Sequence, residues 1–197
     1  MRSKADHPGN LLPDSDIAPL VRAYFEFNHL KQLYRRGWLL RGIPPERCES
    51  VAEHSWGVAM LSMLLAGEHD PGLDLLKVLR MALIHDLGEV YAGDIVPGEA
   101  VSPAEKHARE LDSLQHFLAG LPNAEDYLQL WLEFEAGDSL EARFVRQIDK
   151  LEMALQASVY EHQALADLAV FYQSAGEGIG SEDLVNLLKI IKTLRRP

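Results

Sequence analysis

The sequence predicts an all-α protein with a single domain. After the first fifteen residues, apolar side chains recur at helical spacing in most segments. Two segments begin with a Ser-x-x-Glu pattern, at Ser50 and Ser102, which is typical of a capped helix start. No Asn-Gly or Asp-Gly turn separates alternating apolar runs, so nothing indicates a β-hairpin. The 197 residues can bury a sizeable core, and we expect a flexible lead-in over residues 1–15 followed by a helical domain over 16–197.

The expected helices follow one another along the chain. Residues 16–36 carry apolar side chains at helix-like intervals. Pro44 and Pro45 must interrupt any helix that follows, because neither has a backbone N–H to donate. The helix that begins at Ser50 should end near Gly67. Further helices are expected over 73–87, 102–118, 123–135, 139–174 and 181–195.

Charge and cysteine content limit the classes of partner. The net charge is −11, from 19 Lys and Arg against 30 Asp and Glu, which argues against binding polymeric nucleic acid but leaves room for a small phosphate ligand at a local positive site. The single cysteine, Cys48, has no partner for an internal disulfide. The polar opening "MRSKADHPGN" lacks the apolar core of a signal peptide, and no apolar run is long enough to span a bilayer. The sequence therefore predicts a soluble cytoplasmic protein with no membrane partner.

Four polar side chains interrupt apolar helical stretches on three expected helices: His54, His85, Asp86 and Asp149. Taken singly, a helical histidine is most often a satisfied core or surface residue, and a helical aspartate a solvated one or a cap. Together, imidazoles and carboxylates form a nitrogen and oxygen ligand set for one divalent cation, such as Mn, Co, Fe, Ni, Zn or Mg. Such a cation would also offset the cost of ending an apolar helix with His85 and Asp86.

Two further carboxylates follow closely in "ALIHDLGEVYAGD". If the helix continues, Glu89 lies one turn after His85 and Asp86 and shares their face, where a carboxylate can position a water and move a proton. If the helix stops at "LG", Glu89 is an exposed residue. Asp94 lies in a loop punctuated by glycine and proline, where it is either a turn residue or part of a site.

The most basic short window of this acidic chain is "LKQLYRRGWLLRG". Arg35 and Arg36 could bind phosphate oxygens through their guanidinium groups, and Trp38 offers a flat apolar face. A solvated basic helix end is an equally good interpretation of the same window. Other catalytic patterns are missing from the sequence: it has no Gly-x-Ser-x-Gly elbow, no P-loop and no Gly-x-Gly-x-x-Gly.

The sequence resembles the 5'-deoxynucleotidase branch of the HD-domain metal-dependent phosphohydrolases. The similarity covers about residues 28–165 and is carried by "RRGW", "ESVAEHSWGVAML", "ALIHDLGEVYAGDIVP", "EKHARE" and "RFVRQIDKLEMALQASVYE". The resemblance implies an HD-type helical bundle with one divalent cation held by His54, His85, Asp86 and Asp149. It also implies hydrolysis of deoxyribonucleoside 5'-monophosphates to deoxynucleoside and phosphate, and it suggests a homodimer.

The resemblance also implies roles around the cation. The residue matching Glu89 is the acid or base near the attacking water. The residue matching Asp94 and the short loop through Pro97 contact the sugar region of the substrate.

An arginine followed closely by tryptophan orients the phosphate in that family, and the tryptophan corresponds to Trp38. The spacing favours Arg35 over Arg36 without deciding between them. Catalytic roles are therefore expected for Glu89, Asp94 and Arg35.

Two other functions remain open from the sequence. The protein could be an HD phosphohydrolase that acts on a cyclic nucleotide, a nucleoside triphosphate or an alarmone. It could also be a regulatory module that binds a nucleotide or a metal without turnover. The complete ligand set together with Glu89 disfavours the regulatory module, because a module without catalysis has no need for the extra carboxylate.

Overall fold

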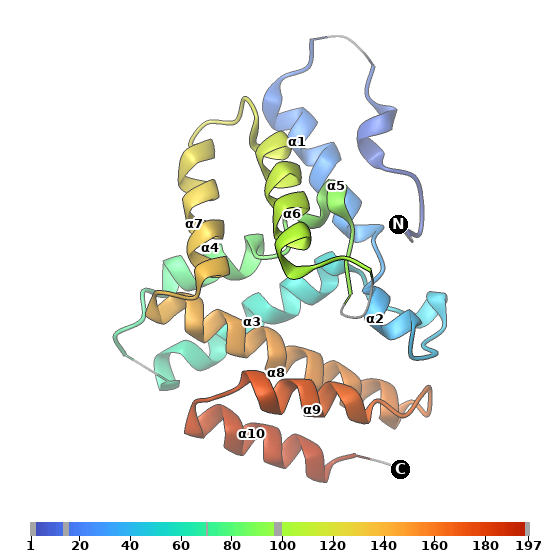
Figure 1. The fold of residues 1–197 in the computed structure, drawn as a ribbon, viewed down its shortest axis with the longest axis vertical. Helices are drawn as coiled ribbons and strands as arrows, with labels where there is room; N and C mark the ends of the chain where they lie inside the picture. The colour runs from blue at the N-terminus through green and yellow to red at the C-terminus, as the bar shows by residue number, and fades with distance from the viewer. Residues whose placement is uncertain (1–2, 14–15, 70, 97–99, 196–197) are drawn as a thin grey trace.

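The computed structural model describes residues 3–13, 16–69, 71–96 and 100–195, and within these ranges the chain is helical, with two isolated β-bridges and no β-sheet. This confirms the all-α fold class (Figure 1). The α-helices are α1 (Pro19–Phe27), α2 (Arg36–Leu39), α3 (Val51–His69), α4 (Leu75–Ile84), α5 (Glu89–Ala92), α6 (Pro103–Leu118), α7 (Ala124–Ala136), α8 (Leu140–His162), α9 (Ala169–Gly178) and α10 (Glu182–Thr193). Short 3₁₀ turns occupy η1 (Pro8–Leu11), η2 (Asn28–Lys31) and η3 (Pro45–Arg47).

Helix α8 is the centre of the fold. It packs against α3, α4 and α7, and also against α9 and α10 (Figure 1). Its inward side chains are fully buried, among them Val145, Ile148 and Ala154. Burying an aliphatic side chain contributes roughly 1.5–3 kcal/mol relative to leaving it exposed. A polar side chain on this face of α8 therefore lies in the core of the molecule.

The two helix starts that the sequence predicts are confirmed. The backbone N–H of Ser50 donates to the Glu53 carboxylate at 2.6 Å, and the Glu53 N–H donates back to the Ser50 hydroxyl at 3.3 Å. This reciprocal pair is a complete capping box at the start of α3. At α6, the Glu105 N–H donates to the Ser102 hydroxyl at 3.2 Å, while the Glu105 carboxylate pairs with Arg109 instead.

The prediction of helical structure throughout residues 16–36 was wrong in its extent. Helix α1 ends at Phe27, η2 follows, and the chain is extended before α2 begins at Arg36. The extended part is fixed by packing: the Leu33 side chain is 1% exposed, and its carbonyl accepts the Val51 N–H at 3.0 Å. Tertiary contacts therefore override the local helical pattern. The apolar stripe of α1 faces solvent at Leu20, Val21, Tyr24 and Phe27.

The single helix expected over 139–174 is two helices. Helix α8 ends at His162, Ala164 takes a left-handed conformation with φ 55°, and α9 begins at Ala169. The buried Glu161 carboxylate stabilises this turn, because it accepts the Leu168 N–H at 2.9 Å and the Tyr172 hydroxyl at 3.0 Å. The turn contains neither glycine nor proline, so the sequence gives no local signal for it.

The described part of the lead-in lies against the helical body. The Lys4 N–H donates to the Gln32 carbonyl at 2.6 Å, and the His7 ring stacks on Tyr91 with the ring centroids 4.9 Å apart. The division between residues 1–15 and 16–197 stays a prediction. Among the described residues, no helix combines the length and the apolar character needed to cross a membrane.

Candidate metal centre

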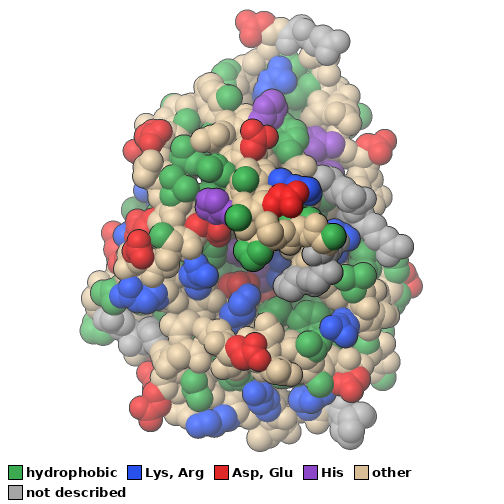
Figure 2. All heavy atoms as spheres, viewed as in Figure 1, with side chains coloured by type: hydrophobic (Ala, Val, Ile, Leu, Met, Phe, Trp, Pro, Cys, Tyr) green, Lys and Arg blue, Asp and Glu red, His purple; other side chains and the backbone are tan. Residues whose placement is uncertain are grey.

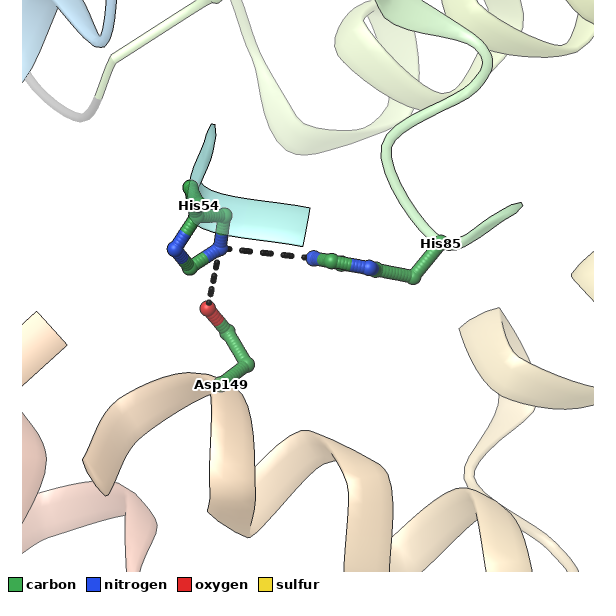
Figure 3. A group of neighbouring side chains, drawn as sticks. All are labelled: His54, His85 and Asp149. Atoms are coloured by element: carbon green, nitrogen blue, oxygen red, sulfur yellow. Dashed lines mark hydrogen bonds and ion pairs between the residues drawn. The ribbon is translucent and has the colours of Figure 1, made fainter. Parts of the chain in front are cut away.

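Two helices and the turn after a third bring the predicted cluster together. His54 lies in the first turn of α3, His85 caps the end of α4, and Asp149 lies near the middle of α8. Their side chains point toward one another (Figure 3). The Nε2 atom of His54 is 3.2 Å from Asp149 Oδ1 and 3.4 Å from His85 Nε2. The Oδ2 atom of Asp86 is 3.2 Å from His85 Nε2 and 3.7 Å from His54 Nε2. All four residues therefore converge on one point.

The turn after α4 positions His85 and Asp86. The helix ends at Ile84, and i-to-i+3 hydrogen bonds continue the chain to α5, including Leu87 N–H to Ile84 O at 2.9 Å. Beyond the end of α4, the backbone carbonyl of His85 accepts a hydrogen bond from the Trp131 indole N–H at 3.0 Å. Gly88 permits the close approach of α6, because a Cβ there would lie 2.9 Å from the Glu110 carbonyl oxygen. Packing of α6 and α7 therefore fixes where the helix ends.

Both imidazoles are oriented through their Nδ1 atoms. His54 Nδ1 is 2.7 Å from Glu152 Oε2, and His85 Nδ1 is 2.8 Å from the Ala82 carbonyl oxygen. Each Nδ1 faces an acceptor, so each Nε2 is left to face the centre of the cluster. Metal-binding histidines in proteins almost always donate their second N–H in this manner.

The electrostatics of the cluster favour positive charge. Burial acts to lower the pKa of the His54 imidazole, but the carboxylates of Asp149 and Glu152 raise it to about 10. Burial acts to raise the pKa of the Asp86 and Asp149 carboxyls, yet the nearby positive groups, including His54 and His85, hold both below the usual range. Ionised carboxylates surrounding buried imidazoles therefore stabilise a cation at the centre.

The donor set and one buried oxygen without a hydrogen bond fit a metal ion. Ligand atoms of His54, His85 and Asp149 all lie within 4.8 Å of one another. Asp86 Oδ2 is buried and has no hydrogen-bond partner among the described residues. Two imidazole nitrogens with carboxylate oxygens suit a borderline divalent cation. The residues present thus fit the metal that the sequence predicts.

A cavity of about 480 Å³ opens onto the cluster. Figure 2 shows a hollow in the middle of the visible face, with acidic side chains at its base and Lys and Arg side chains around its rim. The cavity lining includes most of the predicted site residues: Arg35, Trp38, Asp86, Glu89, Asp94 and Asp149. It also includes apolar side chains such as Ile95, Met153 and Phe171. The cavity thus has a charged base and a partly apolar wall.

Glu89 begins α5 and is buried although α4 has already ended. Its side chain lines the cavity, and its Oε2 atom has no hydrogen-bond partner in the described chain. Burial, together with the negative charges of Asp86 and Asp94, raises the pKa of Glu89 well above its usual value. Burial and the neighbouring negative charges therefore favour the protonated form of this carboxyl group.

The two adjacent arginines have different positions. Arg35 Nη1 lies 3.8 Å from Asp86 Oδ2, inside the cavity. Burial acts to lower the pKa of Arg35, but Asp94, Asp86 and further carboxylates hold it above the usual range. Arg36 instead holds the loop: its backbone N–H donates to the Asp94 carboxylate and its Nη1 to the Asp94 carbonyl at 3.1 Å. Of the two, Arg35 faces the cluster.

Trp38 forms a buried part of the cavity wall. Its indole N–H donates to Glu49 Oε1 at 2.7 Å, and its ring lies 4.0 Å from that of Phe171, measured between centroids. The side chain is only 1% exposed. Pro97, which the resemblance places near the substrate, lies outside the described residues.

Several residues around the site were missed from the sequence. Glu152 and Glu49 lie behind the cluster, whereas Lys106 and Phe171 line the cavity. Glu152 could have been found, because it lies three residues after Asp149 and so shares its helix face. Phe171 could not, because its position depends on the turn between α8 and α9.

The comparisons with known proteins identify the family. The family model described as HD domain matches residues 27–185, which is most of the chain. The chain belongs to the HD domain family.

Relatives and solved structures of this HD domain extend over most of its length. The 5'-deoxynucleotidase HDDC2 of Mus musculus is 34% identical over 182 residues, which are 90% of this chain and 89% of the mouse protein. The 5'-deoxynucleotidase hdd1 of Schizosaccharomyces pombe is 37% identical over 142 residues, 69% of each protein. The crystal structure of the PH0347 protein from Pyrococcus horikoshii OT3 superposes with a TM-score of 0.75 at 30% identity, covering 89% of this chain and 99% of that chain.

Proposed function

We propose that this HD domain is a metal-dependent phosphomonoesterase that hydrolyses deoxyribonucleoside 5'-monophosphates to deoxynucleoside and phosphate. The observation that carries the proposal is the convergence of two imidazole nitrogens and two carboxylates at the base of a cavity that also holds a buried arginine and a buried glutamate. The class of substrate is supported by the relatives that are named 5'-deoxynucleotidases.

The proposed ligands of one divalent cation are His54, His85, Asp86 and Asp149. When bound, such a cation lowers the pKa of a coordinated water and polarises the phosphoryl group. The two imidazoles suit Mn, Co, Fe, Ni or Zn better than Mg, which prefers oxygen ligands. His54 is fully buried and His85 is nearly so, whereas the Asp86 and Asp149 side chains are partly exposed and line the cavity.

Arg35 and Glu89 are the proposed catalytic side chains beside the cation. Arg35 binds phosphoryl oxygens and offsets the negative charge that grows on them during P–O cleavage. Burial beside Asp86 and Asp94 raises the pKa of Glu89, which favours a carboxyl group that can donate a proton to the 5' oxygen of the leaving deoxynucleoside. After that transfer, its carboxylate can accept a proton from the attacking water.

Asp94 and Pro97 are the proposed contacts to the sugar region, whereas Trp38 is proposed to help Arg35 orient the phosphate. Asp94 is held in place by Arg36 and is only 6% exposed. A pocket fitted to deoxyribose would reject a ribose because the additional 2'-hydroxyl is either crowded or left without a partner, an effect worth at most a few kcal/mol. Deoxy selectivity is therefore expected to be moderate.

We also propose that the protein is a cytoplasmic homodimer. The exposed apolar stripe on α1, formed by Leu20, Val21, Tyr24 and Phe27, supports this state. Contiguous apolar surface of this kind commonly marks a protein interface. A second copy of the chain would cover it.

A phosphate-release screen tests the function. The purified protein is incubated with Mn²⁺ or Co²⁺ and with mono-, di- and triphosphates of ribo- and deoxynucleosides. We expect phosphate release from dAMP and dTMP well above that from AMP. Equal rates with AMP would remove the deoxy selectivity, and a preference for a cyclic nucleotide, a triphosphate or an alarmone would replace the proposed substrate. Metal binding without turnover of any nucleotide would indicate a regulatory module.

A further inference from the structure

We propose that Glu152 is a positioning residue of the metal centre: its carboxylate fixes the orientation of the His54 imidazole, and Gly57 leaves the space it needs. This inference rests on the proposed metal-dependent function. It concerns two residues that lie outside the ligand set and do not contact the cavity. Its basis is the geometry behind His54.

Helix α8 supplies both a proposed ligand and the group behind another ligand. Glu152 lies three residues after Asp149, so the two side chains leave α8 from the same face. Asp149 contacts His54 Nε2 at 3.2 Å, and Glu152 Oε2 lies 2.7 Å from His54 Nδ1. The ring is thus held between two carboxylates of one helix. Both His54 and Glu152 are buried, so water does not compete for the Nδ1 contact.

The chemistry of the ring explains why an acceptor is needed there. An imidazole that offers the Nε2 lone pair to a cation keeps its one proton on Nδ1. A carboxylate that accepts this proton fixes the tautomer and the ring plane, and raises the basicity of Nε2. His85 has the backbone carbonyl of Ala82 for the same purpose. Glu152 is therefore the orienting group that a substitution can remove.

Gly57 explains how the Glu152 carboxylate fits beside α3. Gly57 is three residues after His54, in the interior of α3, where glycine is otherwise unfavourable. A Cβ at this position would lie 2.7 Å from Glu152 Oε1 and 3.1 Å from its Cγ. An alanine would thus displace the carboxylate that faces His54.

A second cation is the competing explanation for this cluster. Ligand atoms of Glu49, His54 and Glu152 also lie within 4.8 Å of one another. However, Glu49 Oε1 already accepts the Trp38 indole N–H at 2.7 Å. The 2.7 Å between His54 Nδ1 and Glu152 Oε2 is the length of a charge-assisted hydrogen bond. The contacts therefore favour an orienting carboxylate over a second metal site.

The test compares metal binding by wild type, Glu152→Ala, Glu152→Gln and Glu161→Gln. Affinity and stoichiometry for Mn²⁺ and Co²⁺ are measured by calorimetry, and the coordination geometry by the visible absorption spectrum of the Co²⁺ form. We expect one cation in wild type, and about 10–100-fold weaker binding with an altered spectrum in Glu152→Ala. Glu152→Gln should lose less affinity, because its amide oxygen still accepts the Nδ1 proton. Glu161→Gln removes a buried carboxylate elsewhere on α8 and should leave metal affinity unchanged.

Gly57→Ala supplies an independent arm of the test. The substitution should weaken metal binding in the wild-type background, although Gly57 contacts no proposed ligand atom of the cation. It should add no further loss in the Glu152→Ala background, because both changes act through the same carboxylate. Additive losses would overturn the part assigned to Gly57. If Glu152→Ala does not fold, the metal affinities of Glu152→Gln and Gly57→Ala are compared with that of wild type instead.

The outcomes separate this inference from the proposed function. Wild type that binds no divalent cation overturns the metal centre itself. Wild type that binds one cation, with unchanged affinity and Co²⁺ spectrum in folded Glu152→Ala, overturns only the role of Glu152. Two cations in wild type, falling to one in Glu152→Ala, would establish the second metal site instead and would also overturn the orienting role.

Discussion

Adjacent residues serve different purposes around this site. His85 and Asp86 turn toward the cluster, whereas Arg35 and Arg36 diverge: one faces the cavity and the other holds the loop at Asp94. The divergence arises because Arg35 immediately precedes α2 and Arg36 is its first residue. The role of each arginine is therefore set by its position relative to the first residue of α2.

Glu89→Gln should abolish most turnover while leaving the cation bound. The amide cannot donate a proton to the leaving oxygen, and general acid–base catalysis contributes typically 10²–10⁴-fold. Phosphate release and metal content, measured on the same samples, check this result. Turnover close to wild type in a metal-loaded Glu89→Gln protein would contradict the assigned role.

Arg35→Ala and Arg36→Ala should separate phosphate binding from support of the loop. Arg35→Ala should lower kcat/KM by about 10²–10³-fold, which is typical when one preorganised donor is lost from a transition state. Arg36→Ala should cost far less, because the backbone N–H that contacts Asp94 remains. Steady-state kinetics on dAMP measure both. The assignment fails if the larger loss belongs to Arg36.

The residue types of the site could be predicted better than its supporting contacts. His54, His85, Asp86 and Asp149 were found because charged or polar groups in apolar helices require compensation. Glu152 was missed because a glutamate on a helix is usually solvated, although its spacing to Asp149 places both on one face of α8. Glu49 lies in the segment between η3 and α3, and only the folded structure brings it close to His54.

At the scale of helices, the packing of α9 against α8 depends on the buried carboxylate of Glu161. Glu161 accepts hydrogen bonds from Leu168 and Tyr172 and pairs with Arg195 at 2.8 Å. It therefore connects α8 with both α9 and the end of α10.

Glu161→Gln should make the free energy of unfolding decrease less between neutral and acidic pH than it does in wild type. Burial acts to raise the pKa of Glu161, but its hydrogen bonds, with Arg195 first, lower it below the usual 4.5. A lowered carboxyl pKa contributes stability above about pH 4.5, and this contribution is lost as the pH falls through the lowered value.

Urea unfolding at pH 7 and at pH 3 measures the effect. The decrease in unfolding free energy between the two should be smaller in Glu161→Gln than in wild type. Glu177→Gln, at an exposed carboxylate that accepts a hydrogen bond from the Gln173 amide, is the control and should behave as wild type. Equal decreases in all three proteins would contradict the role of Glu161.

Helix starts could be predicted more accurately than helix lengths. Ser50 and Ser102 were identified because capping is a local interaction. The ends at Phe27 and His162 were missed because contacts distant in sequence decide them, through Leu33 in one case and Glu161 in the other.

For the molecule as a whole, the exposed stripe of α1 is the surface that we propose for contact with a second copy of the chain. A Leu20→Lys, Tyr24→Lys double variant should therefore shift the protein from a dimer to a monomer. Light scattering after size-exclusion chromatography should give twice the 22.0 kDa of one chain for wild type and 22.0 kDa for the variant.

Leu76→Lys, at a side chain that is 68% exposed on α4, should remain dimeric and serves as the matched control. A wild-type monomer, or a double variant that remains dimeric, would contradict the use of the α1 stripe as the interface.

The all-α fold class could be predicted from helical periodicity and from helix-capping residues, because both can be recognised within one short segment of sequence. The cavity could not be predicted in the same way, since it depends on how segments from both halves of the chain meet. Its wall joins Trp38, from a short helix near the start, to Phe171, from α9.

That contact between Trp38 and Phe171 has a consequence for truncated forms of the protein. Every proposed metal ligand precedes residue 150, so a chain cut at the end of α8 would keep the complete coordination set. It would lose the part of the wall that Phe171 and Val170 provide, and the apolar side of the cavity would open to solvent. We therefore expect the C-terminal helices, which carry no recognisable motif, to contribute to binding of the proposed nucleotide but not to binding of the cation.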